Sequence, residues 1–181
     1  MKNIIVSLSI LVSMLLVLPS YASDKTLYYM HGSDLFNPKI ADKRAPRYKK
    51  IVKNLEKRGF DVIYQRKNSA DPEGHALEIA NQVNAQIADG VSPNDIIIGG
   101  YSYGAIVALL ASAQIDNPQV GYALISGCPE NPNINVDIDY QAVKGKVFSV
   151  FDVEDSKFGS CKEKLSQSDV DVTEVKLESG Y

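Results

Sequence analysis

The feature that most constrains the fold is a serine placed between two glycines at the junction of two apolar runs. The turn reads Gly100-Tyr101-Ser102-Tyr103-Gly104, after Ile96-Ile97-Ile98 and before Ile106-Val107-Ala108-Leu109-Leu110-Ala111. The short β-branched run is typical of a buried strand, and the longer run is typical of a buried helix. A serine at the tip of so tight a turn takes a strained backbone conformation, which requires residues with little or no side chain two positions before and after it. The pattern predicts an α/β fold that presents Ser102 at the end of a buried strand. The alternative is a glycine-rich turn with a bystander serine.

The charge pattern and the glycine spacing argue against a nucleic-acid or nucleotide partner. The formal net charge is -3, which leaves no electrostatic footprint for nucleic acid. One basic cluster has helical spacing and is expected to be a solvated face: Lys39, Lys43, Arg44, Arg47, Lys49, Lys50 and Lys53. A dinucleotide-binding loop needs glycines at other offsets, and tyrosines stand here where the backbone would approach a pyrophosphate.

Strand-like and helix-like segments alternate along the chain. The six apolar strand-like runs are residues 27–30, 60–64, 96–98, 120–126, 147–151 and 172–177. Helical stripes lie between several of them, one ending at Gly59 and one running from Asp71-Pro72 to Gly90. This order predicts a three-layer sandwich with a mainly parallel sheet of about six strands and helices on both faces. Ligands bind such sheets beyond the carboxyl ends of the strands, where Ser102 is expected.

The N-terminus and the cysteines indicate export. Residues 1–22 read as a secretory signal peptide, with an apolar run from Ile4 to Leu18 and small residues before a cleavage site after Ala22. An uncleaved membrane anchor is the alternative, although the run is short for a span. Residues 23–181 then form one domain, secreted or periplasmic, with no stable membrane span after cleavage. Cys128 and Cys161 are the only cysteines, and a disulfide between them is favoured over two free thiols.

The chain resembles a small α/β-hydrolase, the superfamily of serine esterases, lipases and thioesterases. The resemblance rests on the Gly100–Gly104 turn, on His31-Gly32 after the first strand of the domain, and on an acidic turn after residues 148–151. It implies that Ser102 is the nucleophile of a nucleophile elbow and that the oxyanion hole uses the backbone N–H groups of Tyr103 and Ser33. It also implies a small-molecule ester or thioester substrate and an acyl-enzyme. No large lid, metal or organic cofactor is expected.

The resemblance leaves the catalytic acid open among three carboxylates in Asp152-Val153-Glu154-Asp155. In the family the acid lies a few residues into the loop after the strand. That position favours Asp155, with Asp152 as the alternative and Glu154 third.

The sequence offers no histidine at the position of the family's general base. The family takes its histidine from the loop after the last strand, and the sequence contains only His31 and His75. His31 is expected to be a packing or hydrogen-bonding residue, and His75 to be a solvated or capping residue; service as the base is the alternative for each. Either the chain is a fragment whose parent continues into a histidine loop, or it is a degraded hydrolase that acts as a binding protein. The chain as given is expected to be nearly inactive. The sequence does not predict the oligomeric state.

Overall fold

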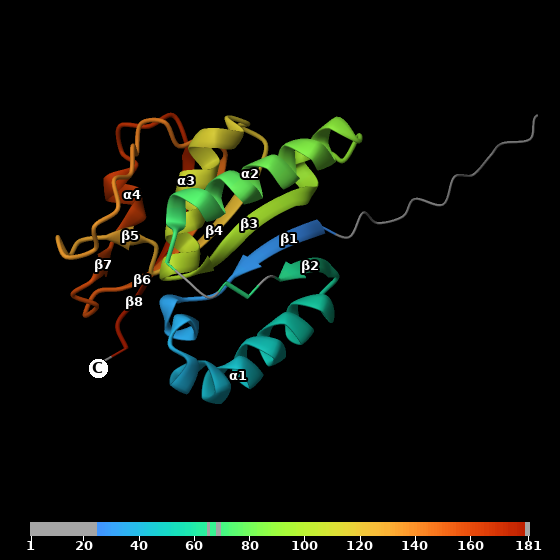
Figure 1. Ribbon diagram of the computed structural model, residues 1–181. Helices are drawn as coiled ribbons and strands as arrows, with labels where there is room; N and C mark the ends of the chain where they lie inside the picture. Colours follow the sequence, from blue (N-terminus) through green and yellow to red (C-terminus); the bar gives the residue numbers. More distant parts are fainter. Residues whose placement is uncertain (1–24, 65, 68–69, 180–181) are drawn as a thin grey trace, which may run out of the picture.

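A parallel six-stranded sheet forms the centre of the molecule (Figure 1). The computed structural model describes residues 25–64, 66–67 and 70–179, so the predicted signal peptide, residues 1–22, lies outside the described part. The strands stand in the order β2-β1-β3-β4-β6-β8 and pair in parallel throughout. They are β1 (Lys25–Met30), β2 (Phe60–Tyr64), β3 (Ile96–Tyr101), β4 (Gly121–Ile125), β6 (Lys146–Asp152) and β8 (Asp171–Leu177). The predicted parallel sheet is confirmed.

Helices lie on both sides of the sheet. The long ones are α1 (Pro38–Glu56), α2 (Pro72–Ala88) and α3 (Tyr103–Ile115); α4 (Cys161–Lys164) and two 3-10 turns, Ser33–Phe36 and Pro93–Asp95, are short. Figure 1 shows α2 and α3 on one face and α1 on the other. Helix α2 begins as the sequence predicts, because the side chain of Asp71 accepts a hydrogen bond from the N–H of Gly74 and Pro72 fills the first turn.

Two apolar cores separate the layers. The larger core joins α2 and α3 to the sheet, and the smaller one joins α1 to β1 and β2. Strand β3 contributes to both, since Ile96 and Ile98 face the larger core and Ile97 packs against the smaller one. Nearly every residue of α3 is buried. The elbow strand and helix therefore lie inside the molecule, as their composition indicates.

The face that carries α1 is only partly covered. Helix α1 lies over β1 and β2, where its apolar side packs with residues of those strands. Tyr101 lies four positions after Ile97 on the same face of β3, and the register aligns it with Ile125, Val150 and Val175 of the next strands. Tyr101, Ile125 and Val175 are exposed. Helices thus occur on both faces, but in the described residues the helix on the second face packs mainly over β1 and β2.

A two-stranded antiparallel sheet and a disulfide hold the loops beyond β4 and β6. Strand β5 (Cys128–Pro129) pairs antiparallel with β7 (Phe158–Gly159). The structure contains the disulfide between Cys128 and Cys161, with both residues buried and their Cα atoms 5.2 Å apart. These bonds tie the loop after β4 to the segment that follows β6. None of the described helices has the length and apolar character to cross a membrane.

Candidate functional site

Ser102 stands at the tip of a strained turn between β3 and α3. Its backbone has φ 53° and ψ -113°, a conformation that non-glycine residues rarely adopt. Its N–H donates to the carbonyl oxygen of Ile125, 2.8 Å away, at the end of β4. A Cβ atom at either Gly100 or Gly104 would collide with the carbonyl oxygen of Met30. The two glycines are therefore needed because the end of β1 runs directly against the turn.

The backbone N–H groups of Tyr103 and Ser33 stand at the starts of two helical segments, where they have no acceptor within the helix. Tyr103 is the first residue of α3, so its N–H lies at the open N-terminus of the helix. Ser33 begins a 3-10 turn directly after Gly32. The loop and the elbow are neighbours, because a Cβ at Gly32 would lie 3.0 Å from the ring of Tyr101. This places both predicted oxyanion donors in loops that meet at the carboxyl ends of β1 and β3.

A hydrogen-bond network that the sequence did not predict holds the loop after β1. The N–H of Gly32 donates to the hydroxyl of Tyr48 at 3.2 Å, and that hydroxyl donates to Asp34 at 2.9 Å. Arg44 donates to the other oxygen of Asp34, also at 2.9 Å. Burial raises the pKa of Tyr48, so its hydroxyl remains a donor. In the sequence Tyr48 reads only as one apolar position of a helical stripe, which gives no sign of this role.

The acidic turn lines an open cavity of about 570 Å³ at the carboxyl ends of the strands. Tyr101 and Ser126 line the same cavity as Asp152, Glu154, Asp155, Leu177 and Ser179. The structure thus brings the acid candidates and the residue before Ser102 to one cavity. It records no contact between either aspartate and a histidine among the described residues.

Asp152 and Asp155 differ in their hydrogen-bond partners. One oxygen of Asp152 accepts from the N–H of Glu154 at 3.0 Å, and the other accepts from the hydroxyl of Ser179. The Ser179 bond is the main cause that lowers the pKa of Asp152. Asp155 accepts from the N–H of Lys157 at 2.8 Å, within its own loop. Asp152 is therefore the carboxylate that faces the loop after β8.

Ser126 is a second strained serine at this edge of the sheet. It follows β4 with φ 50°, and its N–H donates to the carbonyl oxygen of Val150 at 2.9 Å. It is 9% exposed and lines the cavity with the acidic turn. Strained residues collect at functional sites. No sequence pattern singles out Ser126, because its conformation depends on the strand ends around it.

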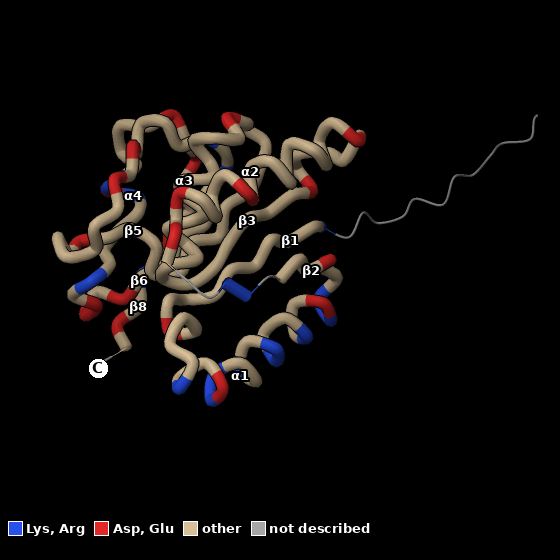
Figure 2. Tube along the Cα trace, viewed as in Figure 1, with Lys and Arg blue, Asp and Glu red and all other residues tan. Residues whose placement is uncertain are grey.

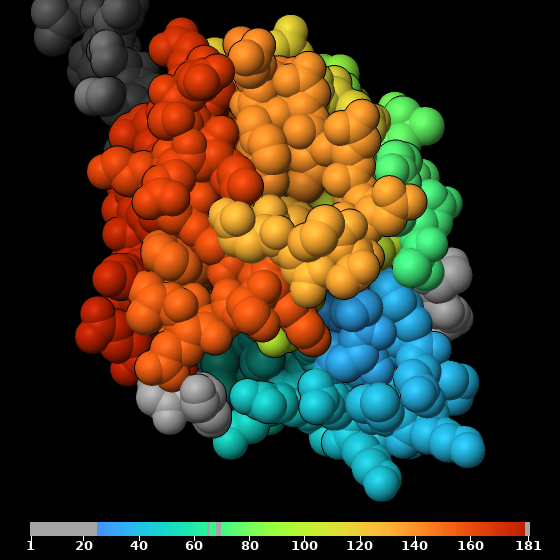
Figure 3. All heavy atoms as spheres, turned by 90° about the vertical axis from the view of Figure 1, so that its left-hand side faces the viewer, coloured from blue at the N-terminus to red at the C-terminus, as the bar shows by residue number. Residues whose placement is uncertain are grey.

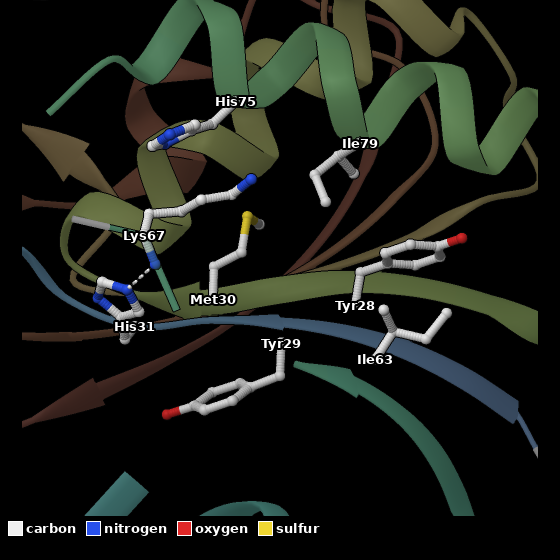
Figure 4. A pocket seen from close by; sticks show the side chains of 8 residues that line it. All are labelled: Tyr28, Tyr29, Met30, His31, Ile63, Lys67, His75 and Ile79. Carbon is white, nitrogen blue, oxygen red and sulfur yellow. Dashed lines mark hydrogen bonds between the residues drawn. The ribbon is translucent and has the colours of Figure 1, made fainter. Parts of the chain in front are cut away.

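His31 is fully engaged in a buried structural position (Figure 4). It is 2% exposed, its Nδ1 lies 2.6 Å from the carbonyl oxygen of Gly32, and its Nε2 accepts from the N–H of Lys67 at 2.9 Å. These partners require a neutral ring with the proton on Nδ1. Burial is the main cause that lowers the pKa of His31. Both nitrogens are hydrogen-bonded, which agrees with the packing or hydrogen-bonding role expected from the sequence.

His75 contacts the elbow helix through a tyrosine. Its Nδ1 is hydrogen-bonded to the hydroxyl of Tyr103 at 2.6 Å, and that hydroxyl accepts from the N–H of Asp71 at 3.0 Å. Burial raises the pKa of Tyr103 to about 12 and lowers the pKa of His75. No hydrogen bond from His75 to Ser102 is recorded in the described structure. The contact instead links the first turn of α3, which carries one predicted oxyanion donor, to the start of α2.

Side chains of the types that bind metal ions do not cluster in the described part of the chain. Within residues 25–64, 66–67 and 70–179, no three or more His, Cys, Asp or Glu side chains gather in a way that could hold a metal ion.

A parallel sheet with a strained serine between strand β3 and helix α3 defines the α/β-hydrolase class. Comparison with family models agrees, since the phospholipase/carboxylesterase model matches residues 27–164. The chain belongs to the phospholipase/carboxylesterase family of α/β-hydrolases. A search of curated proteins found no match.

Solved structures of SOBER1 from Arabidopsis thaliana support the fold. A single-residue variant of SOBER1 is 17% identical with a TM-score of 0.55, and the alignment covers 86% of this chain and 89% of that one. SOBER1 itself is 11% identical with a TM-score of 0.51, over 87% of this chain and 91% of that one. A putative YdeN-like hydrolase from Pectobacterium atrosepticum is 18% identical with a TM-score of 0.49, over 83% and 76% of the two chains.

Proposed function

We propose that Ser102 is the nucleophile of a hydrolase that cleaves a carboxylic ester or thioester through an acyl-enzyme. The observation that carries the proposal is the strained conformation of Ser102, φ 53°, at an elbow whose flanking glycines pack against the carbonyl of Met30. Such strain persists only where the surrounding structure enforces it, and it collects at sites of chemistry. The carboxylesterase family supports the same substrate class.

The remaining groups fit an acyl-transfer mechanism. The N–H groups of Tyr103 and Ser33 would donate to the oxyanion that forms when Ser102 attacks the carbonyl carbon. The serine oxygen forms a bond to the carbonyl carbon while its proton passes to a general base. The bond between that carbon and the leaving alcohol or thiol then breaks, and the leaving group takes the proton. Water next adds to the acyl carbon, which releases the acid and returns a proton to Ser102. These two donors lie in loops that meet at the strand ends, so one substrate carbonyl can face both.

Asp152 is the stronger of the two acid candidates on geometric grounds. Its bond with Ser179 points it toward the loop after β8, whereas Asp155 bonds only within its own turn. An acid in this role orients the base and stabilises its protonated form. We therefore propose Asp152 as the acid and keep Asp155 as the alternative.

The general base is the role that neither histidine fills in this arrangement. Both nitrogens of His31 are hydrogen-bonded, and Nδ1 of His75 is bonded to Tyr103. Loss of the base in a serine protease costs about a million-fold in turnover. The 181-residue chain is therefore proposed to bind and orient an ester while hydrolysing it very slowly. The hydrogen bonds that occupy His31 and His75 are the observation behind a second candidate function, a non-catalytic binding protein on the same fold.

One substitution distinguishes the two functions by installing a base where the structure has room for one. Ser179→His places an imidazole beside Asp152 on the cavity that Tyr101 lines. A positioned base raises the reactivity of a hydroxyl by about 10² to 10⁴. We expect the rate of fluorophosphonate labelling to rise at least about tenfold in this variant.

The controls are Ser179→His combined with Ser102→Ala, which should abolish labelling, and Ser179→His combined with Asp152→Asn or Asp155→Asn. The aspartate whose substitution lowers the rate of labelling more is then identified as the acid. A folded Ser179→His variant that labels no faster than the unaltered chain supports the binding protein instead.

Secretion remains part of this proposal. The predicted signal peptide and the disulfide between Cys128 and Cys161 support an oxidising compartment, periplasmic or extracellular. Expression of the full sequence with its N-terminus, followed by sequencing of the mature end, tests it. Cleavage after Ala22 is expected.

A further inference from the structure

The charges of the chain are distributed unevenly. Residues 38–58, which form α1 and the turn that ends it, hold nine of the 19 Lys and Arg residues but only two of the 22 Asp and Glu residues. The rest of the chain holds twice as many acidic as basic residues. An ordinary solvated surface intersperses charges of both signs. Helix α1 therefore gives an otherwise acidic protein one strongly basic side.

Five lysines form a single row on the outer side of α1. Residues three, four and seven positions apart share one side of an α-helix. Ala41 and Tyr48 are buried against the sheet. The positions opposite them carry five exposed lysines, which we name the lysine stripe: Lys39, Lys43, Lys50, Lys53 and Lys57. The stripe is about 27 Å long at the rise of an α-helix.

The lysine stripe lies on a protruding part of the molecule. Figure 2 shows basic residues along the side of α1 that points away from the sheet. In Figure 3 the same helix, coloured light blue to cyan, forms a ridge along the bottom of the molecule. Its apolar side packs against β1 and β2, so the ridge is fixed to the sheet.

The fold gains little from this row of charges. No residue of the lysine stripe forms an ion pair within the described residues, and the ion pair recorded for α1 joins Arg44 to Asp34. Like charges four positions apart, as at Lys39 and Lys43, destabilise a helix. Lys39 also lies in the first turn, where the helix dipole disfavours a positive charge. The stripe therefore opposes helix stability, and its charges remain available to a partner outside the chain.

We propose that the lysine stripe binds the protein to an anionic phospholipid surface. Lysine carries a compact charge on a flexible stem, which suits the diffuse negative field of such a surface, whereas arginine forks recognise single phosphate groups. A convex ridge lets a flat surface reach all five ammonium groups, whereas a linear polyanion is held in a groove. The apolar side of α1 is already buried in the core, so the attraction is electrostatic and the helix does not insert.

This mode of binding leaves the candidate site accessible. The 3-10 turn Ser33–Phe36 joins the end of β1 to α1, so the stripe begins at the end of the sheet where Ser102 lies. Contact along the outer side of α1 does not cover the carboxyl ends of the strands (Figure 1). The protein bound in this way keeps that end of the sheet beside the lipid and open to solvent.

Cosedimentation of the purified protein with phospholipid vesicles tests the proposal. One set of vesicles is phosphatidylcholine alone, and the other contains about 30% phosphatidylglycerol. Each lysine near an anionic surface strengthens binding about fivefold. We therefore expect binding to the anionic vesicles to be at least about 100-fold tighter at about 0.02 M salt. About 0.3 M salt should remove most of this difference, because it screens charges beyond several ångströms.

Charge reversal within the stripe tests which residues are responsible. Lys43→Glu combined with Lys50→Glu and Lys57→Glu should weaken binding to the anionic vesicles at least about 50-fold, because three attractions become repulsions. Arginine at the same three positions keeps the charge and should preserve the binding constant within about threefold. Circular dichroism of each variant checks that it is folded.

The matched control is Lys146→Glu combined with Lys157→Glu and Lys162→Glu. It changes the net charge equally at exposed positions outside α1, and it should weaken binding less than about fivefold. All variants share one N-terminus, and binding is measured without a reaction, so the result does not depend on the role of Ser102. Equal binding to both kinds of vesicle, or equal losses in the control and the stripe variant, overturns the proposal. Binding to soluble polyglutamate without binding to anionic vesicles overturns it as well, because the partner is then an acidic polymer.

Discussion

The elbow and the acidic turn lie at the same end of the sheet, yet the structure builds them in different ways. The elbow is enforced by backbone packing, since Gly100 and Gly104 leave room for the carbonyl of Met30 and the N–H of Ser102 bonds to β4. The acidic turn is held by side-chain bonds on exposed loops, such as that between Asp152 and Ser179. The fold therefore fixes the position of Ser102 through the backbone, whereas the proposed acid depends on side-chain bonds between loops.

The largest expected effect comes from filling the space inside the elbow. Gly104→Val forces a branched side chain against the carbonyl and Cβ of Met30. We expect a loss of about 4 kcal/mol in the free energy of unfolding, because neither backbone can move away. Gly121→Ala is the matched control in the neighbouring strand, where a Cβ would meet its nearest atom at 3.4 Å, and it should cost less than about 1 kcal/mol. Urea unfolding of both variants measures the difference, and equal losses would contradict the packing argument.

Removal of the disulfide should destabilise mainly the segments next to the acidic turn, namely β5, β7 and α4. Cys128→Ser with Cys161→Ser opens a link across 33 residues that ties the loop after β4 to α4. We expect a loss of about 3 kcal/mol in the free energy of unfolding. Hydrogen exchange should show faster opening of β5, β7 and α4 than of β3 and α3. Equal acceleration in both regions would mean that the two parts are not independent.

A smaller effect is expected from the side chain that joins the elbow helix to α2. Tyr103→Phe removes the hydroxyl that is hydrogen-bonded to His75 and that accepts from the N–H of Asp71. The cost should be about 1 to 2 kcal/mol, since two partners are left without a hydrogen bond. His75→Ala combined with Tyr103→Phe gives the double-mutant cycle. Strict additivity of the two single losses would show that the contact is unimportant.

The smallest expected effect is a pH dependence of stability. Burial lowers the pKa of His31 and of His75 in the folded state. A histidine with a lowered folded pKa takes up protons more readily when unfolded, so its contribution is complete above the unfolded pKa of about 6.5 and is lost as pH falls below it. Thermal unfolding should therefore occur at lower temperature at about pH 5 than at about pH 7. The difference should shrink in the double variant His31→Gln, His75→Gln, and an unchanged difference would assign it to carboxylates instead.

The parts of the molecule that could be predicted from the sequence are those whose constraints are local. Alternating apolar runs indicated the strands, and the requirement for small residues around Ser102 is visible within five positions. The Tyr48–Asp34 network and the conformation of Ser126 depend on residues that meet only in the folded chain. The ranking of Asp152 against Asp155 depends on one hydrogen bond from a distant loop. The partly uncovered sheet face also escaped prediction, because apolar strands look alike whether or not a helix covers them.

Peptide mapping by mass spectrometry after prolonged fluorophosphonate treatment tests whether Ser102 is the nucleophile. We expect a single phosphonylated residue, Ser102, in the unaltered chain, with slow labelling and with no modification of Ser126 or Ser33. Ser102→Ala should then carry no phosphonate at all. Labelling spread over several surface serines, or retained in Ser102→Ala, would contradict the assignment of Ser102 as the nucleophile.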